Sequence, residues 1–188
     1  MEQSTAAPSF SHSFLRRVLG AALCRSTVYD EVKRDRRGTI QAALIVVLAA
    51  VLPATARIID RPALLLVFAS LAIAFWAFEA EILFIVARFW VAPSVLQGKR
   101  PCLLRTLGFA GTPAILAAVL IETSHPQLVV ALFGMWGLTA SVVAVRQALG
   151  VSTGRAITIG VTALIGVVDI VILVSLLGLA ALAALFLR

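Results

Sequence analysis

Four ionisable residues interrupt the apolar stretches of this 188-residue chain and are the first candidates for chemistry. Glu79, Glu81 and Arg88 lie in the second long apolar stretch, and Asp169 lies in the last. If these stretches cross a bilayer, a charge near its centre costs about 2.5 to 3.5 kcal/mol on insertion scales. Each of the four therefore needs a partner, a proton, contact with water or a function.

Asp169 is the deepest of the four. At about 1.5 Å per helical residue, Asp169 lies about 20 Å into its stretch, whereas Glu79 and Glu81 lie about 24 and 27 Å along theirs, near an interface. Asp169 is therefore the first choice for a functional carboxylate. The alternative is that Asp169 accepts a hydrogen bond from a neighbouring helix and only fixes its register.

The sequence carries no pattern typical of a catalytic, cofactor or metal site. Its two histidines are His12 and His125, and it has no GxSxG, no HExxH and no phosphate-binding glycine loop. The turn 150–155 (GVSTGR) does not match a P-loop. Cys24 and Cys102 have neither a CxxC neighbour nor the histidine spacing of a metal site. We predict no enzyme, no cofactor and no metal.

The composition predicts an integral membrane protein. The chain is 61% hydrophobic and 13% charged, with a mean hydropathy of +1.05. Soluble domains are about half apolar and about a quarter charged. A span needs about 20 apolar residues, so the sequence predicts an all-α polytopic bundle of about five transmembrane helices, at 39–55, 63–90, 104–121, 127–148 and 156–187.

Two of these spans carry small or helix-breaking residues. Gly108, Gly111 and Pro113 predict a broken third helix, which is tolerated where neighbouring helices satisfy the freed backbone groups. The fourth span has small residues that predict a packing seam: Gly134, Gly137, Ala140, Ser141 and Ala144.

The chain before these spans divides into a polar flexible tail, 1–13, and an amphipathic basic juxtamembrane segment, 14–38. In the latter, Leu15 and Leu19 recur at helical spacing with Arg16 and Arg17 between them, which predicts a helix on a membrane surface. The charged run 29–37 predicts a solvated collar at the lipid headgroups. The first 37 residues hold no long apolar run, so we expect no cleaved signal peptide and a first span that is retained.

The basic residues are distributed unevenly between the two sides of such a bundle. If the spans alternate, thirteen of the sixteen Lys and Arg fall on the side of the N-terminus. The positive-inside rule then predicts a cytoplasmic N-terminus and a C-terminus on the opposite side. The basic residues follow the membrane borders without interleaved aromatics, so we expect anionic lipid, and not nucleic acid, as their partner.

Three stretches, 29–42 (YDEVKRDRRGTIQA), 103–116 (LLRTLGFAGTPAIL) and 142–157 (VVAVRQALGVSTGRAI), together resemble the bacterial branch of the Yip1 domain family. The resemblance covers roughly residue 14 to the end and implies a five-span domain over 39–188, in a bacterial inner membrane. Eukaryotic members act in vesicle trafficking and associate with small GTPases and with one another.

The resemblance implies a packing and cytoplasmic-face signature without a catalytic role. It consists of Arg105, Thr106, Gly108, Phe109, Pro113, Arg146, Gln147, Ser152, Thr153, Gly154 and Arg155. The predicted cytoplasmic-face signature among them is Arg105, Arg146, Gln147, Ser152, Thr153 and Arg155. The chain departs from the family pattern at 78–88 (FEAEILFIVAR), where two acids raise the question of whether this span faces lipid or a protein partner.

Two function classes remain open. The first is a non-enzymatic, membrane-organising adaptor or accessory subunit of a membrane complex, whose partners are other membrane proteins or itself. The second is a small transporter or channel that uses Asp169, with Pro113 marking a helix break along the path.

Overall fold

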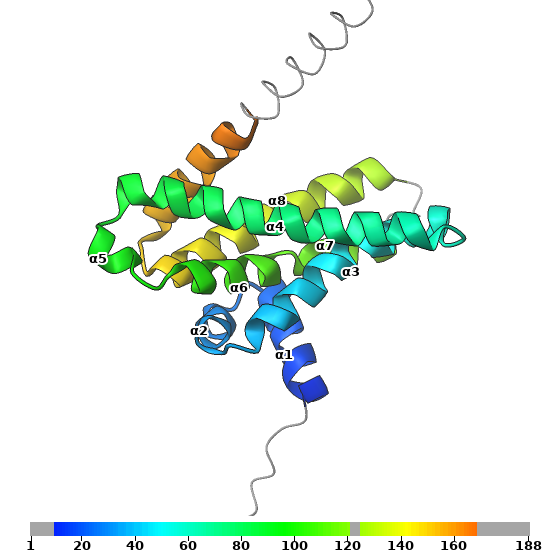
Figure 1. Ribbon diagram of the computed structural model, residues 1–188, viewed down its shortest axis with the longest axis horizontal. Helices are drawn as coiled ribbons and strands as arrows, with labels where there is room; N and C mark the ends of the chain where they lie inside the picture. The colour runs from blue at the N-terminus through cyan, green and yellow to red at the C-terminus, as the bar shows by residue number, and fades with distance from the viewer. Residues whose placement is uncertain (1–9, 121–124, 169–188) are drawn as a thin grey trace, which may run out of the picture.

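The computed structural model describes residues 10–120 and 125–168, and within them every regular element is a helix. Figure 1 shows a bundle of roughly aligned helices with two shorter helices on one side of it. The bundle consists of α3 (Gly38–Ile58), α4 (Pro62–Trp90), α6 (Arg100–Ala110), α7 (Thr112–Leu120), α8 (Pro126–Leu149) and the helix Thr153–Val168. The helices beside it are α1 (Phe10–Ala22) and α2 (Ser26–Arg34).

Three helices are long and apolar enough to cross a membrane: Pro62–Trp90, Arg100–Ala118 and Gln127–Leu149. A fourth is counted if α2 and α3, which are bent by 120° at their junction, are taken together. Because α2 carries charges of both signs, we treat α3, and not α2, as the membrane-spanning part of this bent pair. Thr153–Val168 is a shorter apolar helix at the start of the predicted fifth span, whose remainder lies outside the described residues.

The third predicted span is broken where the glycines and proline indicated. α6 ends at Ala110, Gly111 N–H donates to the Gly108 carbonyl at 3.2 Å, and α7 begins at Thr112. Thr112 Oγ1 donates to the Phe109 carbonyl at 2.6 Å, which satisfies a carbonyl at the break. The expected broken helix is therefore present.

The packing seam of α8 is narrower than predicted. Ala140 and Ala144 are fully buried. A Cβ added at Gly134 or Gly137 would meet nothing within 4 Å, so these two glycines contact no neighbouring helix in the described structure.

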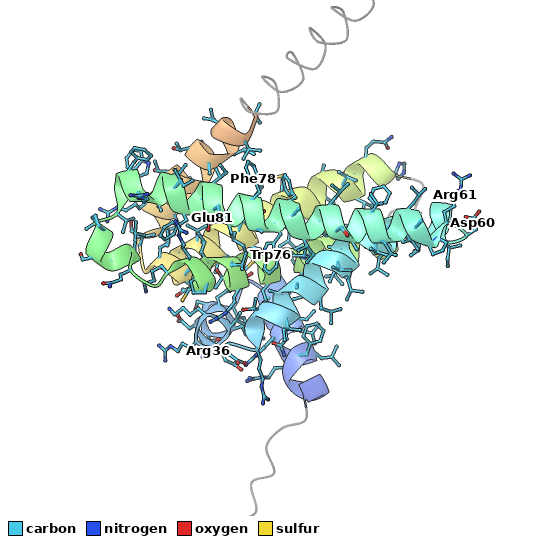
Figure 2. The ribbon with its side chains drawn as sticks, viewed as in Figure 1. Arg36, Asp60, Arg61, Trp76, Phe78 and Glu81 are labelled. Atoms are coloured by element: carbon cyan, nitrogen blue, oxygen red, sulfur yellow. The ribbon has the colours of Figure 1, made fainter. Side chains whose placement is uncertain are left out.

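The two ends of the bundle differ in charge. The α3–α4 turn, with Asp60 and Arg61, lies at one end (Figure 2). α5 (Pro93–Leu96) and the C-terminal end of α8 lie at the other (Figure 1). The basic loops around 88–105 and 146–155 therefore lie at the same end.

Candidate functional site

The clearest hollow among the described residues is a groove between three helices. It is formed by α4, α8 and Thr153–Val168 and has a volume of about 280 Å³. Its lining is almost entirely apolar, with Glu79 as its charged residue and Ser141 as its hydroxyl. Gly160, where an added Cβ would meet nothing within 4 Å, lines it on the third helix.

Glu79 faces this groove because of how α4 is packed. The buried residues of α4 recur at steps of three and four along one face of the helix: Trp76, Ala80, Leu83 and Ala87. Trp76 Nε1 donates to the Leu104 carbonyl at 3.0 Å and ties this face to α6. Glu79 precedes Ala80 and lies at the edge of the buried face, beside α8 and not over α6.

Glu81 lies on a different side of α4. Two residues along a helix turn the side chain through about 200°, and Glu81 Oε1 lies 3.7 Å from Arg100 Nη1. The Arg100 guanidinium also lies 4.7 Å from the centroid of the Phe84 ring. Both charged groups are about half exposed, so the pair stabilises the fold by less than about 1 kcal/mol. Glu81, labelled on α4 in Figure 2, thus has a local partner.

Of the predicted intramembrane polar residues, the three that the structure describes do not share one site. Arg88 is exposed in the last turn of α4, and Asp169 lies outside the described residues. Of the three that the structure describes, Glu79 lines the groove, and Glu81 and Arg88 do not. Counting residues along each stretch makes Asp169 the first candidate because it lies deepest. Glu79 becomes a candidate because residues of two other helices line the same groove, which a count along one helix cannot show.

Half of the predicted cytoplasmic-face signature gathers around the end of α2. Arg105 Nη1 donates to the Lys33 carbonyl at 3.0 Å, and its Nε donates to Thr39 Oγ1 at 2.9 Å. The cation therefore satisfies a free carbonyl at a helix C-terminus. Lys33 Nζ in turn donates to the Gln147 carbonyl at 3.0 Å.

The side chain of Gln147 extends this contact. With the amide oriented so that both of its groups find a partner, its nitrogen donates to Asp30 Oδ1 at 3.3 Å and its oxygen accepts from Arg146 Nη2 at 3.2 Å. Arg146 Nη1 also donates to Thr153 Oγ1 at 3.1 Å. Arg105, Arg146 and Gln147 therefore join helices to one another.

The other half of the signature lies at the start of the last helix. Ser152, Thr153 and Arg155 are all exposed, and the Arg155 N–H donates to Ser152 Oγ at 3.4 Å. Thr153 is the link between the two halves, through its bond from Arg146. These three residues form a polar turn at the basic end of the bundle.

A charge cluster that the sequence did not predict joins α1, α2 and α3. Arg17 Nη2 and Nε donate to Glu31 Oε1 at 2.8 and 3.0 Å. Arg17 Nη1 donates to Asp35 Oδ2 and to Gln41 Oε1, both at 2.7 Å. The Arg17 side chain is only 8% exposed. Arg16 adds two bonds to the Glu31 carboxylate at 2.9 and 2.8 Å.

The cluster is electrostatically balanced. Burial alone would lower the pKa of Arg17, but hydrogen bonds to Asp35 and Glu31 raise it overall. Two arginines face two carboxylates, so the interior carries no net charge here. The expected solvated collar at 29–37 is present in part. Arg34, Arg36 and Arg37 are exposed, whereas Glu31 and Asp35 hold α1 in place.

The C-terminal carbonyls of α1 are also satisfied by side chains. Tyr29 OH donates to the Ala21 carbonyl at 3.3 Å, and Trp136 Nε1 donates to the Ala22 carbonyl at 2.7 Å. Tyr29 is fully buried, and Cys24 turns the chain with a positive φ of 52°. The end of α1 is thus attached to α2 and to α8.

Within the part of the chain that the structure describes, no three His, Cys, Asp or Glu side chains lie close enough together to hold a metal ion. Two features stand out in the described structure. One is the apolar groove between α4, α8 and Thr153–Val168, and the other is the pair α1 and α2, which hydrogen bonds hold to the bundle. Comparisons of the chain with protein-family models, with curated proteins and with solved structures give no match.

Proposed function

We propose that this chain is an integral membrane protein that acts as a non-enzymatic adaptor or accessory subunit, and that it binds a transmembrane helix of another membrane protein or of a second copy. The observation that carries the proposal is the apolar groove with Glu79 in its wall. An ionisable side chain at membrane depth is a functional candidate by default.

The lining of the groove suits a helix better than a polar solute. Helices associate in lipid through close packing and hydrogen bonds, because lipid tails are as apolar as leucine. Gly160 and Ala163 provide small residues, and Ser141 and Glu79 provide polar groups for a donor on the partner. A basic or hydroxyl side chain on the partner helix is the expected counterpart of Glu79.

We propose the same orientation as the charge distribution predicts, with the basic end of the bundle in the cytoplasm of a bacterial cell. The placement of the basic loops at one end of the bundle supports this (Figure 1). The resemblance to the Yip1 domain family, whose eukaryotic members associate with other proteins, supports an adaptor role.

Filling the groove tests the proposal. Gly160→Leu places a larger side chain in open space within the groove, and Gly166→Leu makes the same change on the same helix away from the lining residues. Native mass spectrometry of protein extracted in mild detergent from its own membrane should show a stoichiometric partner for the wild type and for Gly166→Leu, and none for Gly160→Leu.

A photo-crosslinking amino acid at Val161, an exposed groove residue, should join the same partner. Two results would contradict the proposal. One is a bare monomer for the wild type, and the other is a partner that survives Gly160→Leu.

The alternative of a small transporter is favoured by the same carboxyl, since an acid in an apolar groove also suits a proton or a lipophilic cation. Glu79→Gln and Asp169→Asn separate the two functions. If the protein is a transporter, Glu79→Gln or Asp169→Asn should abolish ion-coupled flux in reconstituted vesicles. An adaptor should show no protein-dependent flux at all and should keep its partner with Asp169→Asn.

A further inference from the structure

Three leucines form an exposed stripe along α1 and the turn residue that follows it. Leu15, Leu19 and Leu23 recur at steps of four and are 59%, 63% and 60% exposed. Steps of four place side chains on one face of a helix. The opposite face holds Arg17, Gly20 and Ala21, all of which are buried. The leucine side chains therefore point away from the bundle, and the Arg17 side chain points toward it.

The hydrogen bond between Trp136 of α8 and the end of α1 fixes the position of this stripe along the length of α8. Trp136, which donates to the Ala22 carbonyl, lies ten residues after Pro126 and thirteen before Leu149. At 1.5 Å per residue, the contact is about 15 Å from one end of α8 and about 20 Å from the other. Since α8 is long and apolar enough to span a membrane, the end of α1 lies beside the middle of that span.

Glycine allows α1 and α2 to approach closely enough to hold this position. A Cβ at Gly20 would lie 2.4 Å from Val28 Cγ2, so the two helices touch there. Arg17 meets Glu31 and Asp35 on the side away from the stripe, whereas Arg16, which is 67% exposed, lies at the edge of the stripe and pairs with Glu31. No ion pair among the described residues crosses the leucine face.

We infer that the stripe Leu15, Leu19 and Leu23 lies among the acyl chains of one leaflet, so that α1 is a membrane-inserted helix fastened to the bundle. Lipid is the occupant because Trp136 holds the end of α1 beside the middle of a helix that is long and apolar enough to span a membrane. The inference rests on the proposed membrane insertion of the bundle.

Spin-label accessibility tests the inference in nanodiscs of mixed neutral and anionic lipid. A nitroxide is attached at Leu19→Cys, at Leu71→Cys on the exposed face of α4, and at Gln97→Cys in the exposed loop after α5, each with Cys24→Ser and Cys102→Ser. Positions 19 and 71 should collide with oxygen several-fold more often than position 97. They should collide several-fold less often with a water-soluble nickel chelate.

Each other outcome has a distinct meaning. A nickel-accessible label at 19 with a lipid-facing label at 71 overturns the inference and leaves the bundle in the membrane. A label at 19 that neither reagent reaches also overturns it, because a protein surface then covers the stripe. A nickel-accessible label at 71 overturns the membrane insertion of the bundle and the inference with it.

Discussion

Gly108 on α6 lies so close to Ala42 on α3 that a Cβ added to the glycine would be 2.5 Å from the alanine Cβ and 3.0 Å from its Cα. The second neighbour is backbone, which cannot rotate away. Helix α6 and helix α3 therefore meet through their main chains, as membrane helices do where small residues face each other.

Gly108→Ala should destabilise the bundle by about 1 to 3 kcal/mol, the usual cost of inserting a group into a packed core. The measurement is unfolding by denaturing detergent in micelles. Gly134→Ala is the matched control, because its Cβ would meet nothing within 4 Å, and it should leave stability unchanged or slightly higher. Equal losses for both variants would contradict the close α3–α6 contact.

Arg17→Met should release α1 and α2 from the bundle. It leaves the carboxylates of Glu31 and Asp35 without their shared cation, at a cost of about 1 to 3 kcal/mol. Hydrogen exchange should rise in α1 and α2 and stay low in α4 and α8. Arg16→Met is the control, since its side chain is 67% exposed and its loss should cost less than about 1 kcal/mol.

Acid should loosen the same contact through Asp35. Burial alone would raise the pKa of Asp35, but hydrogen bonds from Arg17 and from the Arg37 N–H hold it below the ordinary value of 3.8. The folded form then binds fewer protons than the unfolded form in this range. The stability that Asp35 adds is therefore complete above its ordinary pKa and is lost as the pH falls through the lowered value.

The mobility of a spin label at position 19, followed from pH 6 to pH 2.5, measures this effect. Asp35→Asn should weaken the acid-induced rise in mobility, whereas Asp60→Asn, in the exposed turn at the far end of the bundle, should retain it. An unchanged acid profile for Asp35→Asn would show that another group controls the release.

Trp136→Phe should free the end of α1 while keeping the aromatic packing of α8. The indole ring stacks on Phe133 with centroids 5.5 Å apart, which a phenyl ring can preserve. The lost hydrogen bond to the Ala22 carbonyl should cost about 0.5 to 1.5 kcal/mol. Proteolysis near residue 23 should become faster in this variant and not in Trp90→Phe, which changes a half-exposed tryptophan.

The long apolar elements could be predicted from the sequence, because bilayer thickness and helix rise determine their length. The expected span 63–90 coincides with α4 (Pro62–Trp90) to within one residue, and the break after Gly108 follows from residues that cannot continue a helix. The fifth span and the position of Asp169 stay predictions, since most of that stretch lies outside the described residues.

The N-terminal contacts could not be predicted in the same way. Helical periodicity places Arg17 between leucines but does not say which face is covered, and its partners Glu31 and Gln41 lie 14 and 24 residues away. Similarly, the spacing of Glu79 and Glu81 separates their directions on α4, but only the packing of Trp76 on α6 shows that Glu79 faces the groove.

The attachment of the first helices to α8 sets an order of events during synthesis. Ala22 binds Trp136 and Lys33 binds Gln147, each across 114 residues of chain. At about 5 to 20 residues per second, α1 and α2 leave the ribosome about 6 to 23 seconds before their partners exist. During that delay Ala22 and Lys33 lack their partners on α8, so the N-terminal helices complete their docking late although they are made first.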